Sequence, residues 1–303
     1  MSNRFYNVIY AIAYRERNEN NCLYKGKNQS AFEVLKSTWR YWYADPIVFS
    51  YQGEEYLFAE RMDRLRGKGI LVAAKIEQNG IGEFKPVLEE PYHLSYPFVF
   101  EKSGKLYMIP ESTADKSVKL YACKQFPYQW ELVKVLCHDV LYADTNVVSA
   151  QSHFYLITGE MDPQIGAKTK TLVFEADGIE QGELHAFEQN KSGEFSFEQR
   201  GAGRWIEENG DLIQPTQCGD AENYGTALKF SAVSFADSMM RVQELCTVQT
   251  GEVTFHSKKN ISGMHTYAQS EKYEIVDVKY TQKTNIAVLS GRVFRKISSI
   301  FNR

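Results

Sequence analysis

The sequence predicts an all-β protein, a five-bladed β-propeller, and three observations support this. Aromatic residues make up 14 % of the chain, with 19 Tyr and 18 Phe, and strands favour these residues. Short apolar runs occur in pairs that are separated by polar turns. The pairs recur at intervals of roughly 50 to 60 residues, which suits one four-stranded blade with its loops. A β-sandwich would explain the strands but not this interval.

Composition and charge argue against several classes of protein. The formal charge of −3 and the pI of about 6.1 give no overall attraction to nucleic acid. Five scattered cysteines without a CxxC pair indicate free thiols rather than a disulfide framework or a structural zinc site. The N-terminal apolar run is too short to span a bilayer and lacks a cleavage site. We therefore expect a cytoplasmic protein.

Residues 1–38 are interpreted as a lead-in segment. The aromatic stretch Phe5–Tyr14 is compatible with a strand, and residues 30–36 with a short helix that Ser30 caps and Glu33 supports. This segment is expected to close the domain by pairing with the C-terminal strands.

Residues 39–280 are predicted to form the propeller. Its five strand pairs span residues 45–60, 95–111, 143–159, 201–217 and 263–277. Outer strands are predicted between the pairs, over residues 69–76, 118–123 and 184–188.

A propeller places the first strand of each blade along the central axis, so its leading residue points into a shared funnel. These leading residues are Asp45, Tyr96, Asp144, the Gly203–Arg204 region and His265, and the second strands end at Glu60, Glu111 and Gln217. Carboxylates from different blades suit acid and base catalysis at a glycosidic bond. Asp45, Glu111 and Asp144 are the candidate catalytic residues, and the others are candidate substrate-binding residues. The alternative for Asp45 and Asp144 is a turn-forming role before a strand.

Several blocks of the sequence resemble one known family. These blocks are Trp42–Pro46, Tyr56–Glu60, Leu88–Phe100, Tyr107–Glu111, Tyr142–Thr145 and Gln217–Gly225. The family is that of the N-terminal domain of plant glucosamine inositolphosphorylceramide transferase, whose bacterial members occur in cell-surface polysaccharide biosynthesis. It is similar in turn to the five-bladed propellers of arabinanases, invertases and levansucrases.

The resemblance implies roles for individual residues. Asp45 matches the first-blade acid of those hydrolases, and Glu111 and Asp144 are candidates for the other two acids. Tyr96 stands where the hydrolases carry a second-blade acid, which argues against a simple hydrolase mechanism. Tyr224, in the last matching block, joins the candidate substrate-binding residues.

Two further features concern substrate binding. The loop of residues 61–69 carries Arg64, Arg66 and Lys68, which could clamp a phosphate or pyrophosphate; the alternative is a solvated turn. His93 and His265 precede strands of the predicted blades and could contact a hydroxyl or phosphate, or else be satisfied by the backbone. The sequence has no metal-binding histidine motif, so neither a metal nor another cofactor is expected.

Residues 281–303 form a basic tail. Apolar residues at helical spacing and the positive charges of Arg292, Arg295, Lys296 and Arg303 predict an amphipathic helix that lies on an anionic membrane face. The alternative is a helix packed on the propeller or on a second subunit.

These observations favour a glycosyltransferase of cell-surface polysaccharide biosynthesis. The expected partners are an activated sugar donor and a glycan or lipid-linked glycan acceptor, with peripheral contact to the inner face of the cytoplasmic membrane. A furanosyl donor activated by phosphate or pyrophosphate, such as phosphoribosyl pyrophosphate, is one extension. The alternatives are a glycoside hydrolase or phosphorylase that acts on furanosides, and a non-catalytic glycan-binding propeller.

Overall fold

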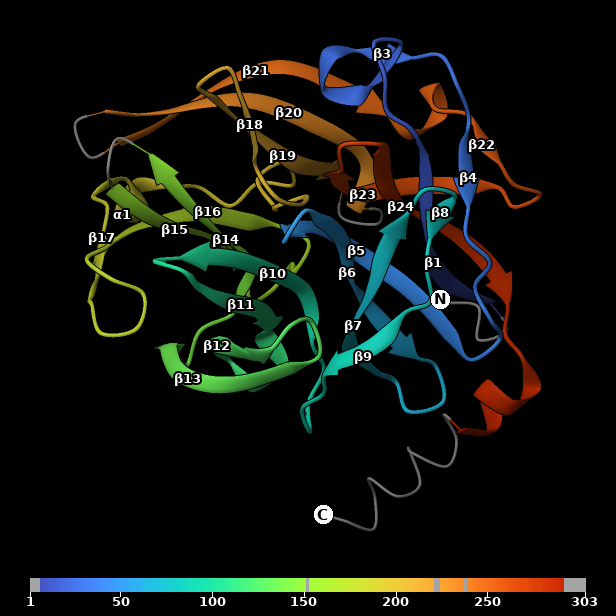
Figure 1. Cartoon of the computed structure of the whole chain (residues 1–303), viewed down its shortest axis with the longest axis horizontal. Helices are drawn as coiled ribbons and strands as arrows, with labels where there is room; N and C mark the ends of the chain where they lie inside the picture. Colours follow the sequence, from blue (N-terminus) through green and yellow to red (C-terminus); the bar gives the residue numbers. More distant parts are fainter. Residues whose placement is uncertain (1–5, 151–152, 221–223, 237–238, 292–303) are drawn as a thin grey trace.

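The chain is a five-bladed β-propeller, as the sequence predicted. A computed structural model describes residues 6–150, 153–220, 224–236 and 239–291. Five sheets surround a central axis, and a two-stranded ribbon lies beside them (Figure 1). The sheets are antiparallel except for the short parallel pair of β22 (Phe255–His256) and β4 (Phe32–Val34) in the fifth sheet. Within these residues, no helix is long and apolar enough to cross a membrane.

The first four blades follow one another along the chain. Blade 1 holds β5 (Tyr41–Tyr51), β6 (Glu54–Asp63), β7 (Lys68–Glu77), β8 (Gly80–Ile81) and β9 (Lys85–Leu88). Blade 2 holds β10 (Ser95–Lys102), β11 (Lys105–Ser112), β12 (Ser117–Gln125) and β13 (Gln129–His138). Blade 3 holds β14 (Tyr142–Ala150), β15 (His153–Met161), β16 (Thr169–Ala176) and β17 (Leu184–Ala186). Blade 4 holds β18 (Ile206–Glu208), β19 (Asp211–Gly219), β20 (Tyr224–Ala236) and β21 (Met239–Gln249).

The fifth blade is assembled from both ends of the chain. It combines β23 (Ile261–Gln269) and β24 (Tyr273–Lys283) with β1 (Tyr6–Glu16), β4 (Phe32–Val34) and β22 (Phe255–His256). The remaining elements are the ribbon strands β2 (Asn21–Cys22) and β3 (Lys27–Asn28), helix α1 (Gln189–Ser192) and three 3₁₀ turns, at Leu23–Lys25, Thr113–Asp115 and Thr250–Glu252.

This closure confirms the expected pairing of the N-terminal segment with the C-terminal strands, and it corrects two other expectations. Residues 6–34 are not a lead-in outside the propeller, because β1 pairs with β24 along its whole length and β4 pairs with β1. The boundaries at 38 and 280 therefore cut through the fifth blade, which continues to Lys283. The short helix expected over residues 30–36 is wrong, since the strand β4 lies there. The packing of Phe32, which is fully buried, outweighs the local capping signal.

The hairpin turns explain why the strand pairs were visible in the sequence. The turns at Gln52–Gly53, Ser103–Gly104 and Asn209–Gly210 each place two consecutive residues at positive φ. This is the type I′ geometry that joins twisted antiparallel strands through two residues, and it favours glycine at the second position. The turn chemistry therefore fixes the register of the inner strands.

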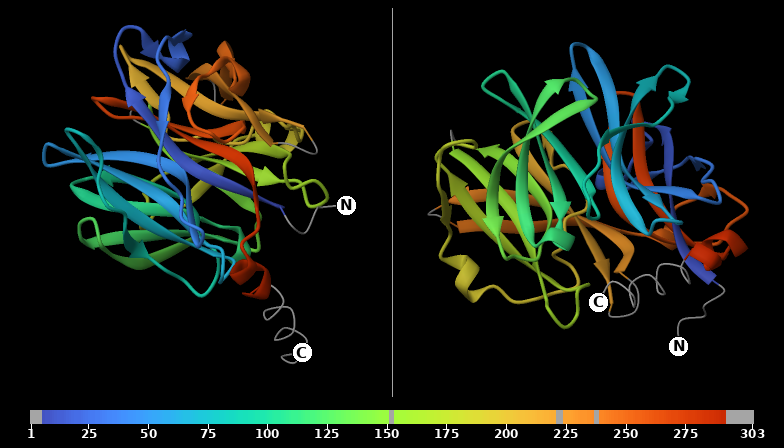
Figure 2. Two further views of the ribbon diagram at one scale, coloured as in Figure 1. Left: turned by 90° about the vertical axis from the view of Figure 1, so that its right-hand side faces the viewer. Right: turned by 90° about the horizontal axis from the view of Figure 1, so that it is seen from below.

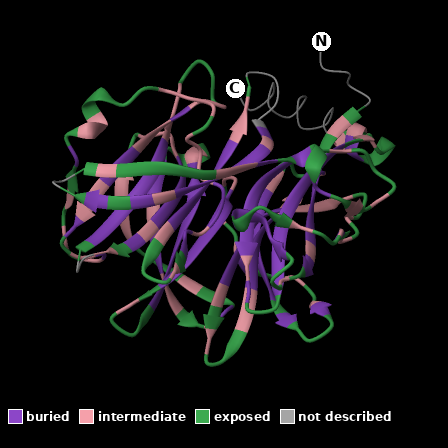
Figure 3. Ribbon diagram, turned by 90° about the horizontal axis from the view of Figure 1, so that it is seen from above, coloured by how far each residue is buried: buried purple, intermediate pink, exposed green. Residues whose placement is uncertain are grey.

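The hydrophobic core lies between the blades. Figure 3 shows that the central strands are mostly buried and the loops mostly exposed. One cluster joins blades 1 to 3 around Phe98 and Tyr121, and another joins blades 4 and 5 around Phe230 and Tyr267. Because both faces of each sheet pack against neighbouring blades, the inner strands read as near-continuous apolar runs.

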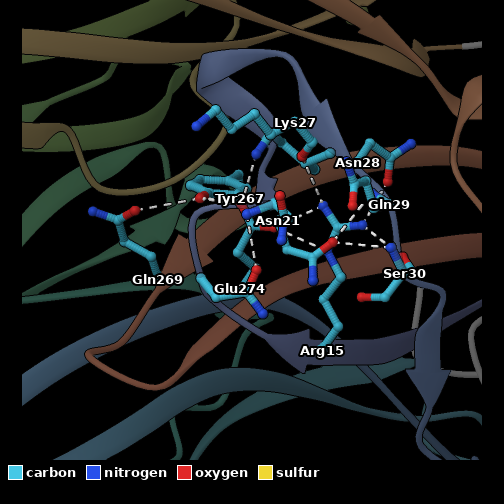
Figure 4. Close-up of polar contacts among 12 residues, drawn as sticks. Arg15, Asn21, Lys27, Asn28, Gln29, Ser30, Tyr267, Gln269 and Glu274 are labelled. Carbon is cyan, nitrogen blue, oxygen red and sulfur yellow. Dashed lines mark hydrogen bonds and ion pairs between the residues drawn. The ribbon is translucent and has the colours of Figure 1, made fainter.

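A buried ion pair fastens the fifth blade (Figure 4). Arg15 on β1 donates to Glu274 Oε2 on β24 at 2.9 and 2.8 Å, and the side chains are 1 % and 0 % exposed. Glu274 Oε1 also accepts hydrogen bonds from Tyr267 Oη and the Leu23 backbone amide, each at 2.7 Å. The network thus ties the N-terminal strand and ribbon to the last two strands of the propeller.

Candidate active site

The inner strands of three blades begin with the same unusual backbone. Asp45, Tyr96 and Asp144 have φ of 53°, 44° and 53°, and each lies at a break in pairing with the second strand. Left-handed backbone is costly for residues other than glycine and concentrates at functional sites. The three positions are structurally equivalent, as their alignment in the sequence predicted, and they lie near the starts of the inner strands β5, β10 and β14, at one end of the propeller. This end is called the entrance.

Asp45 is held by three blades. Its Oδ2 accepts the Tyr96 backbone amide at 3.1 Å, and its Oδ1 accepts the Thr266 hydroxyl at 3.2 Å. His265 Nε2 lies 3.5 Å from Asp45 Oδ1. Burial raises the pKa of Asp45, whereas the charge of His265 acts in the opposite direction. Asp45 is therefore a buried, oriented carboxyl group whose charge depends on His265.

Asp277 orients the histidine. Its carboxylate accepts the backbone amides of Asp45, His265 and Thr266 at 2.9 to 3.1 Å, and His265 Nδ1 lies 2.6 Å from Asp277 Oδ1. Burial acts to lower the pKa of His265, but Asp277 and Asp45 outweigh it and raise that pKa. Asp277, His265 and Asp45 thus form a continuous polar chain in which the imidazole can pass a proton to or from Asp45.

Asp144 and Glu111 are bridged by an arginine that the sequence analysis did not single out. Arg200 Nε donates to Asp144 Oδ2 at 2.7 Å, and Arg200 Nη2 donates to Glu111 Oε2 at 3.3 Å. Burial raises the pKa of Asp144 to about 8, although Arg200 acts to lower it. Arg200 therefore holds the carboxyl groups of Asp144 and Glu111 in place with a single positive charge.

The Arg200 bridge predicts a change in titration. In Arg200→Gln the pKa of Asp144 should rise from about 8 by one unit or more, since an adjacent arginine typically lowers a carboxyl pKa by about 1–3 units. ¹³C NMR titration of labelled aspartate carboxyl groups would measure the shift. Arg66→Gln, outside this cluster, is the matched control. An Asp144 titration that is the same in both variants would contradict the assignment.

Glu60 is the acid most suited to staying protonated. It is 5 % exposed, and its Oε1 makes no hydrogen bond with any residue that the structure describes. Burial, with the nearby charges of Asp45 and Glu111, holds the pKa of Glu60 well above its usual range. Glu60 can therefore donate a proton at neutral pH while another acid is ionised.

His93 faces Glu60 through one nitrogen. His93 Nδ1 accepts the Gly69 amide at 2.9 Å, so the proton of the neutral ring lies on Nε2, which is 3.5 Å from Glu60 Oε1. Burial lowers the pKa of His93, which favours this neutral form. Gly69 permits the approach, because a Cβ there would lie 2.6 Å from both Glu60 Oε1 and the Leu94 carbonyl oxygen.

Glu60→Gln should stabilise the protein near neutral pH, because Glu60 is protonated in the folded chain. Above the ordinary pKa of glutamate, about 4.3, the unfolded chain ionises at Glu60 whereas the folded chain does not, so stability is lost as pH rises. We expect Glu60→Gln to raise the Tm by about 3 °C at about pH 7.5 and to change little at about pH 4. Thermal unfolding across this range, with exposed Glu194→Gln as control, is the measurement. A variant that is less stable than the parent at both values would rule out a neutral Glu60.

Tyr96 takes a bridging role at the second blade. It is 1 % exposed, and its hydroxyl accepts the Gly203 amide at 3.0 Å and the Asn146 side-chain amide at 2.8 Å. Its own backbone amide binds Asp45. Tyr96 therefore links blades 1 to 4 at the position where an acid would otherwise open the second blade.

An aromatic wall lies beside the acids on the fifth-blade side. Tyr10 stacks on His265 at 4.6 Å between ring centroids, and Trp42 packs against Tyr10 at 5.2 Å. Trp42 is half-buried. Aromatic faces of this kind are suited to stacking on sugar rings.

The predicted phosphate clamp does not join the acids. Arg66 and Lys68 both contact Glu89 Oε1, at 3.2 and 2.9 Å, and Arg64 Nη1 donates to the Trp39 carbonyl at 2.8 Å. Arg64 and Arg66 lie in the turn between β6 and β7, and Lys68 is the first residue of β7. Arg64 is buried, whereas Arg66 and Lys68 form ion pairs with Glu89.

Arg204 also lies away from the acids. It binds the backbone carbonyls of Val48 and Val99 and stacks over Phe98 at 4.6 Å. It thus spans the channel from blade 4 to blades 1 and 2, past the entrance, and burial lowers its pKa to about 10. The expectation that Arg204 contacts substrate beside the acids is corrected by this position.

Gln217 and Tyr224 complete the predicted set. Gln217 is 2 % exposed and donates to the Gly201 carbonyl at 2.8 Å, so it supports the segment that carries Arg200. Tyr224 is the first residue of β20, and its side chain lies outside the described part of the chain.

One group of side chains has the composition of a metal site. Single donor atoms of Asp45, His265 and Asp277 lie within 4.8 Å of one another. The Asp277 carboxylate, however, already accepts three backbone amides and faces His265. These donors are committed to the hydrogen-bonded chain, so the residues fit proton transfer better than cation binding.

The sequence analysis missed Arg200, Asp277 and Tyr10. Asp277 carried a readable signal, since it is a charged residue inside the apolar strand Tyr273–Lys283. Tyr10 lies in a stretch that was read as lead-in, and Arg200 lies in the irregular segment before β18, where no periodicity marks it.

Comparison with known families identifies the chain. Residues 33–292 match the family described as glucosamine inositolphosphorylceramide transferase 1, N-terminal. The chain belongs to this family. The resemblance seen in the sequence is thereby confirmed.

Curated relatives in the family are plant proteins. Glucosamine inositolphosphorylceramide transferase 1 of Arabidopsis thaliana is 31 % identical over 197 residues, which cover 63 % of this chain and 25 % of the relative. The protein of the same name from Oryza sativa subsp. indica is 30 % identical over 178 residues, which cover 57 % and 24 %. The chain thus spans about a quarter of the length of these relatives.

Solved structures with the same fold are glycoside hydrolases. An α-L-arabinofuranosidase from Lactobacillus brevis superposes with a TM-score of 0.51 at 14 % identity, covering 77 % of this chain and 81 % of that one. The GH62 α-L-arabinofuranosidase domain of Coprinopsis cinerea gives 0.52 at 10 % identity, covering 78 % and 90 %. At these identities the likeness establishes the family's fold alone.

Proposed function

We propose that the chain is a carbohydrate-active enzyme that transfers a glycosyl group to a glycan during cell-surface polysaccharide biosynthesis. The observation that carries this proposal is that two buried acids with different surroundings, Asp45 and Glu60, lie at the same entrance. Asp45 is oriented and coupled to His265, whereas Glu60 is buried without a hydrogen-bond donor to its Oε1 among the described residues. Such a pair supplies a base and a neutral acid at the same pH.

Each residue of the site has its own role in the proposed glycosyl transfer. Asp45 accepts the proton of the acceptor hydroxyl and can pass it to His265, whose positive charge the Asp277 carboxylate stabilises. Glu60 hydrogen-bonds the sugar or the departing group, and Glu111 places negative charge where an oxocarbenium-like centre develops. Asp144, whose pKa of about 8 keeps it largely protonated at neutral pH, hydrogen-bonds the sugar. The half-buried Trp42, which packs against Tyr10, offers a stacking face for the sugar.

Transfer is favoured over hydrolysis by two observations. Tyr96 occupies the second-blade position with its hydroxyl bound to Gly203 and Asn146, and the family relatives carry the name of a transferase. A furanosyl donor is the first to test, because neighbours in fold include arabinofuranosidases. A phosphate- or pyrophosphate-activated furanose, such as phosphoribosyl pyrophosphate, is one member of that class, and a lipid-linked glycan is the acceptor proposed.

The test incubates the full chain with nucleotide-, phosphate- and pyrophosphate-activated sugars and an oligosaccharide or lipid-linked acceptor, and mass spectrometry follows the acceptor. The proposal expects a mass gain of one sugar residue that depends on the donor. Release of sugar from aryl furanosides without any donor would instead support the second candidate, a furanoside hydrolase. Saturable glycan binding without turnover, unchanged in Asp45→Asn, would favour a binding propeller and overturn both enzymes.

A further inference from the structure

The strands of blades 5 and 1 extend past the acids on the entrance side. β24 continues from Asp277 to Lys283, where it pairs with Tyr6 at the start of β1. In blade 1, β5 begins at Tyr41, before Asp45, and β6 ends after Glu60. The ends of these strands and the loops that join them form one surface around the mouth of the site, called the entrance rim. In Figure 2 the start of β1 (dark blue) and the turn after β24 (red) lie on the same side.

The entrance rim exposes large apolar side chains. Trp39 is 48 % exposed, Tyr6 43 %, Val8 53 % and Ile286 80 %. Trp39 lies in the connection from blade 5 to blade 1, and its carbonyl binds Arg64. A buried Val288 fixes the helical residues 286–291 to the propeller, so Ile286 is presented from an anchored turn. Exposed aromatic and aliphatic residues around a functional mouth mark an interaction surface.

Cations accompany these apolar groups. A pocket of about 220 Å³ on the rim is lined by Arg40, Arg61, Arg66 and Lys68, and by the carboxylates of Asp63 and Glu89. Tyr41 lies between two of these arginines, with the guanidinium carbons of Arg40 and Arg61 at 4.9 and 4.8 Å from its ring centroid. The cations outnumber the acids, whereas the whole chain has a formal charge of −3. The lining of this pocket therefore carries a net positive charge.

We propose that the entrance rim docks the propeller on the anionic face of a lipid bilayer, with the acids facing the headgroups. Exposed tryptophan and tyrosine suit the headgroup region of a bilayer, and surrounding arginines and lysines are attracted to anionic lipids. The sequence beyond residue 291, outside the described residues, adds Arg292, Arg295 and Lys296 directly after this rim. Docking in this orientation would deliver a lipid-borne substrate to the site without its leaving the bilayer. The proposal does not depend on which reaction the acids perform.

Vesicle sedimentation of the full chain tests the docking. Vesicles of phosphatidylcholine alone are compared with vesicles that contain about a third phosphatidylglycerol. We expect binding to the anionic vesicles only, and we expect Trp39→Ser and Arg66→Gln each to weaken it about five-fold. Tyr128→Ser and Lys124→Gln, on blade 2 and exposed to a similar degree, are the matched controls and should bind as the parent does.

Three results would overturn the proposal. The first is equal sedimentation with neutral and anionic vesicles, and the second is equal weakening by the rim variants and their controls. The third is anionic binding that persists in Trp39→Ser and Arg66→Gln but vanishes when residues 292–303 are removed, because the tail alone would then bind lipid. Circular dichroism of each variant confirms that it folds. Because this readout needs no turnover, it can fail while the proposed glycosyl transfer stands, and the reverse also holds.

Discussion

Replacement of Asp45 by asparagine should lower kcat/KM of the proposed transfer by about three orders of magnitude, since a positioned general base contributes about 10²–10⁴-fold. Asparagine keeps the shape of the side chain and one oxygen for the Tyr96 amide, but it cannot accept a proton. The loss should fall mainly on kcat, because the stacking face of Tyr10 and Trp42 is untouched. Steady-state kinetics with the donor identified by mass spectrometry would measure it.

The control for this variant is Asp211→Asn, an exposed aspartate at the opposite end of the propeller, at the start of β19. It should retain the activity of the parent. His265→Gln extends the test, because it removes the group that couples to Asp45 and should flatten the pH dependence of kcat/KM. If Asp45→Asn keeps activity within about three-fold of the parent, Asp45 is not the base.

Replacement of Arg15 by alanine should lower the free energy of unfolding by about 3–5 kcal/mol, since it leaves Glu274 as a buried charge without its cation. For a chain of 303 residues that corresponds to a fall in Tm of roughly 5–8 °C. Thermal or urea unfolding would measure the loss. Lys25→Ala, which breaks the exposed pair with Glu208, should cost less than about 1 kcal/mol.

A double variant distinguishes charge from packing. Arg15→Met with Glu274→Gln removes both charges but keeps acceptor oxygen for Tyr267 and the Leu23 amide. It should be more stable than Arg15→Met alone, because the destabilisation comes from an unpaired buried carboxylate rather than from lost volume. A double variant no more stable than Arg15→Met would mean that packing of the Arg15 side chain dominates.

The propeller could be predicted from the sequence because its signals are local. The alternation of the strands and the turns at Gln52–Gly53 and Ser103–Gly104 each specify a hairpin without reference to the rest of the chain. Asp45 and Asp144 could be grouped for a topological reason, since a propeller brings the start of every inner strand to one axis. The position of Arg204 was mispredicted because Gly203, at φ 119°, redirects the chain there. A Cβ on Gly203 would lie 2.0 Å from the Tyr267 carbonyl oxygen, so the close approach requires glycine.

The residues that tune the acids could not be found in this way. Arg200 reaches Asp144 and Glu111 from a segment without regular pairing, and Asp277 acts through backbone amides of other strands. These contacts join residues far apart in sequence, and no period or motif encodes them. Charged residues inside apolar strands, such as Arg15, Glu274 and Asp277, are the one sequence feature that marks such positions, because burial of a charge demands a partner.

The closure of the fifth blade also orders events in time. Arg15 and Glu274 are 259 residues apart, so β1 pairs only with the short strand β4 until residues 273–283, which form β24, have been made. Until then β1 exposes the whole edge that β24 covers and an apolar face, a state prone to aggregation. Asp277, His265 and Tyr10 also meet only at this last step. The nascent protein therefore gains its completed site and its sealed ring at the same moment, and an incomplete chain has neither.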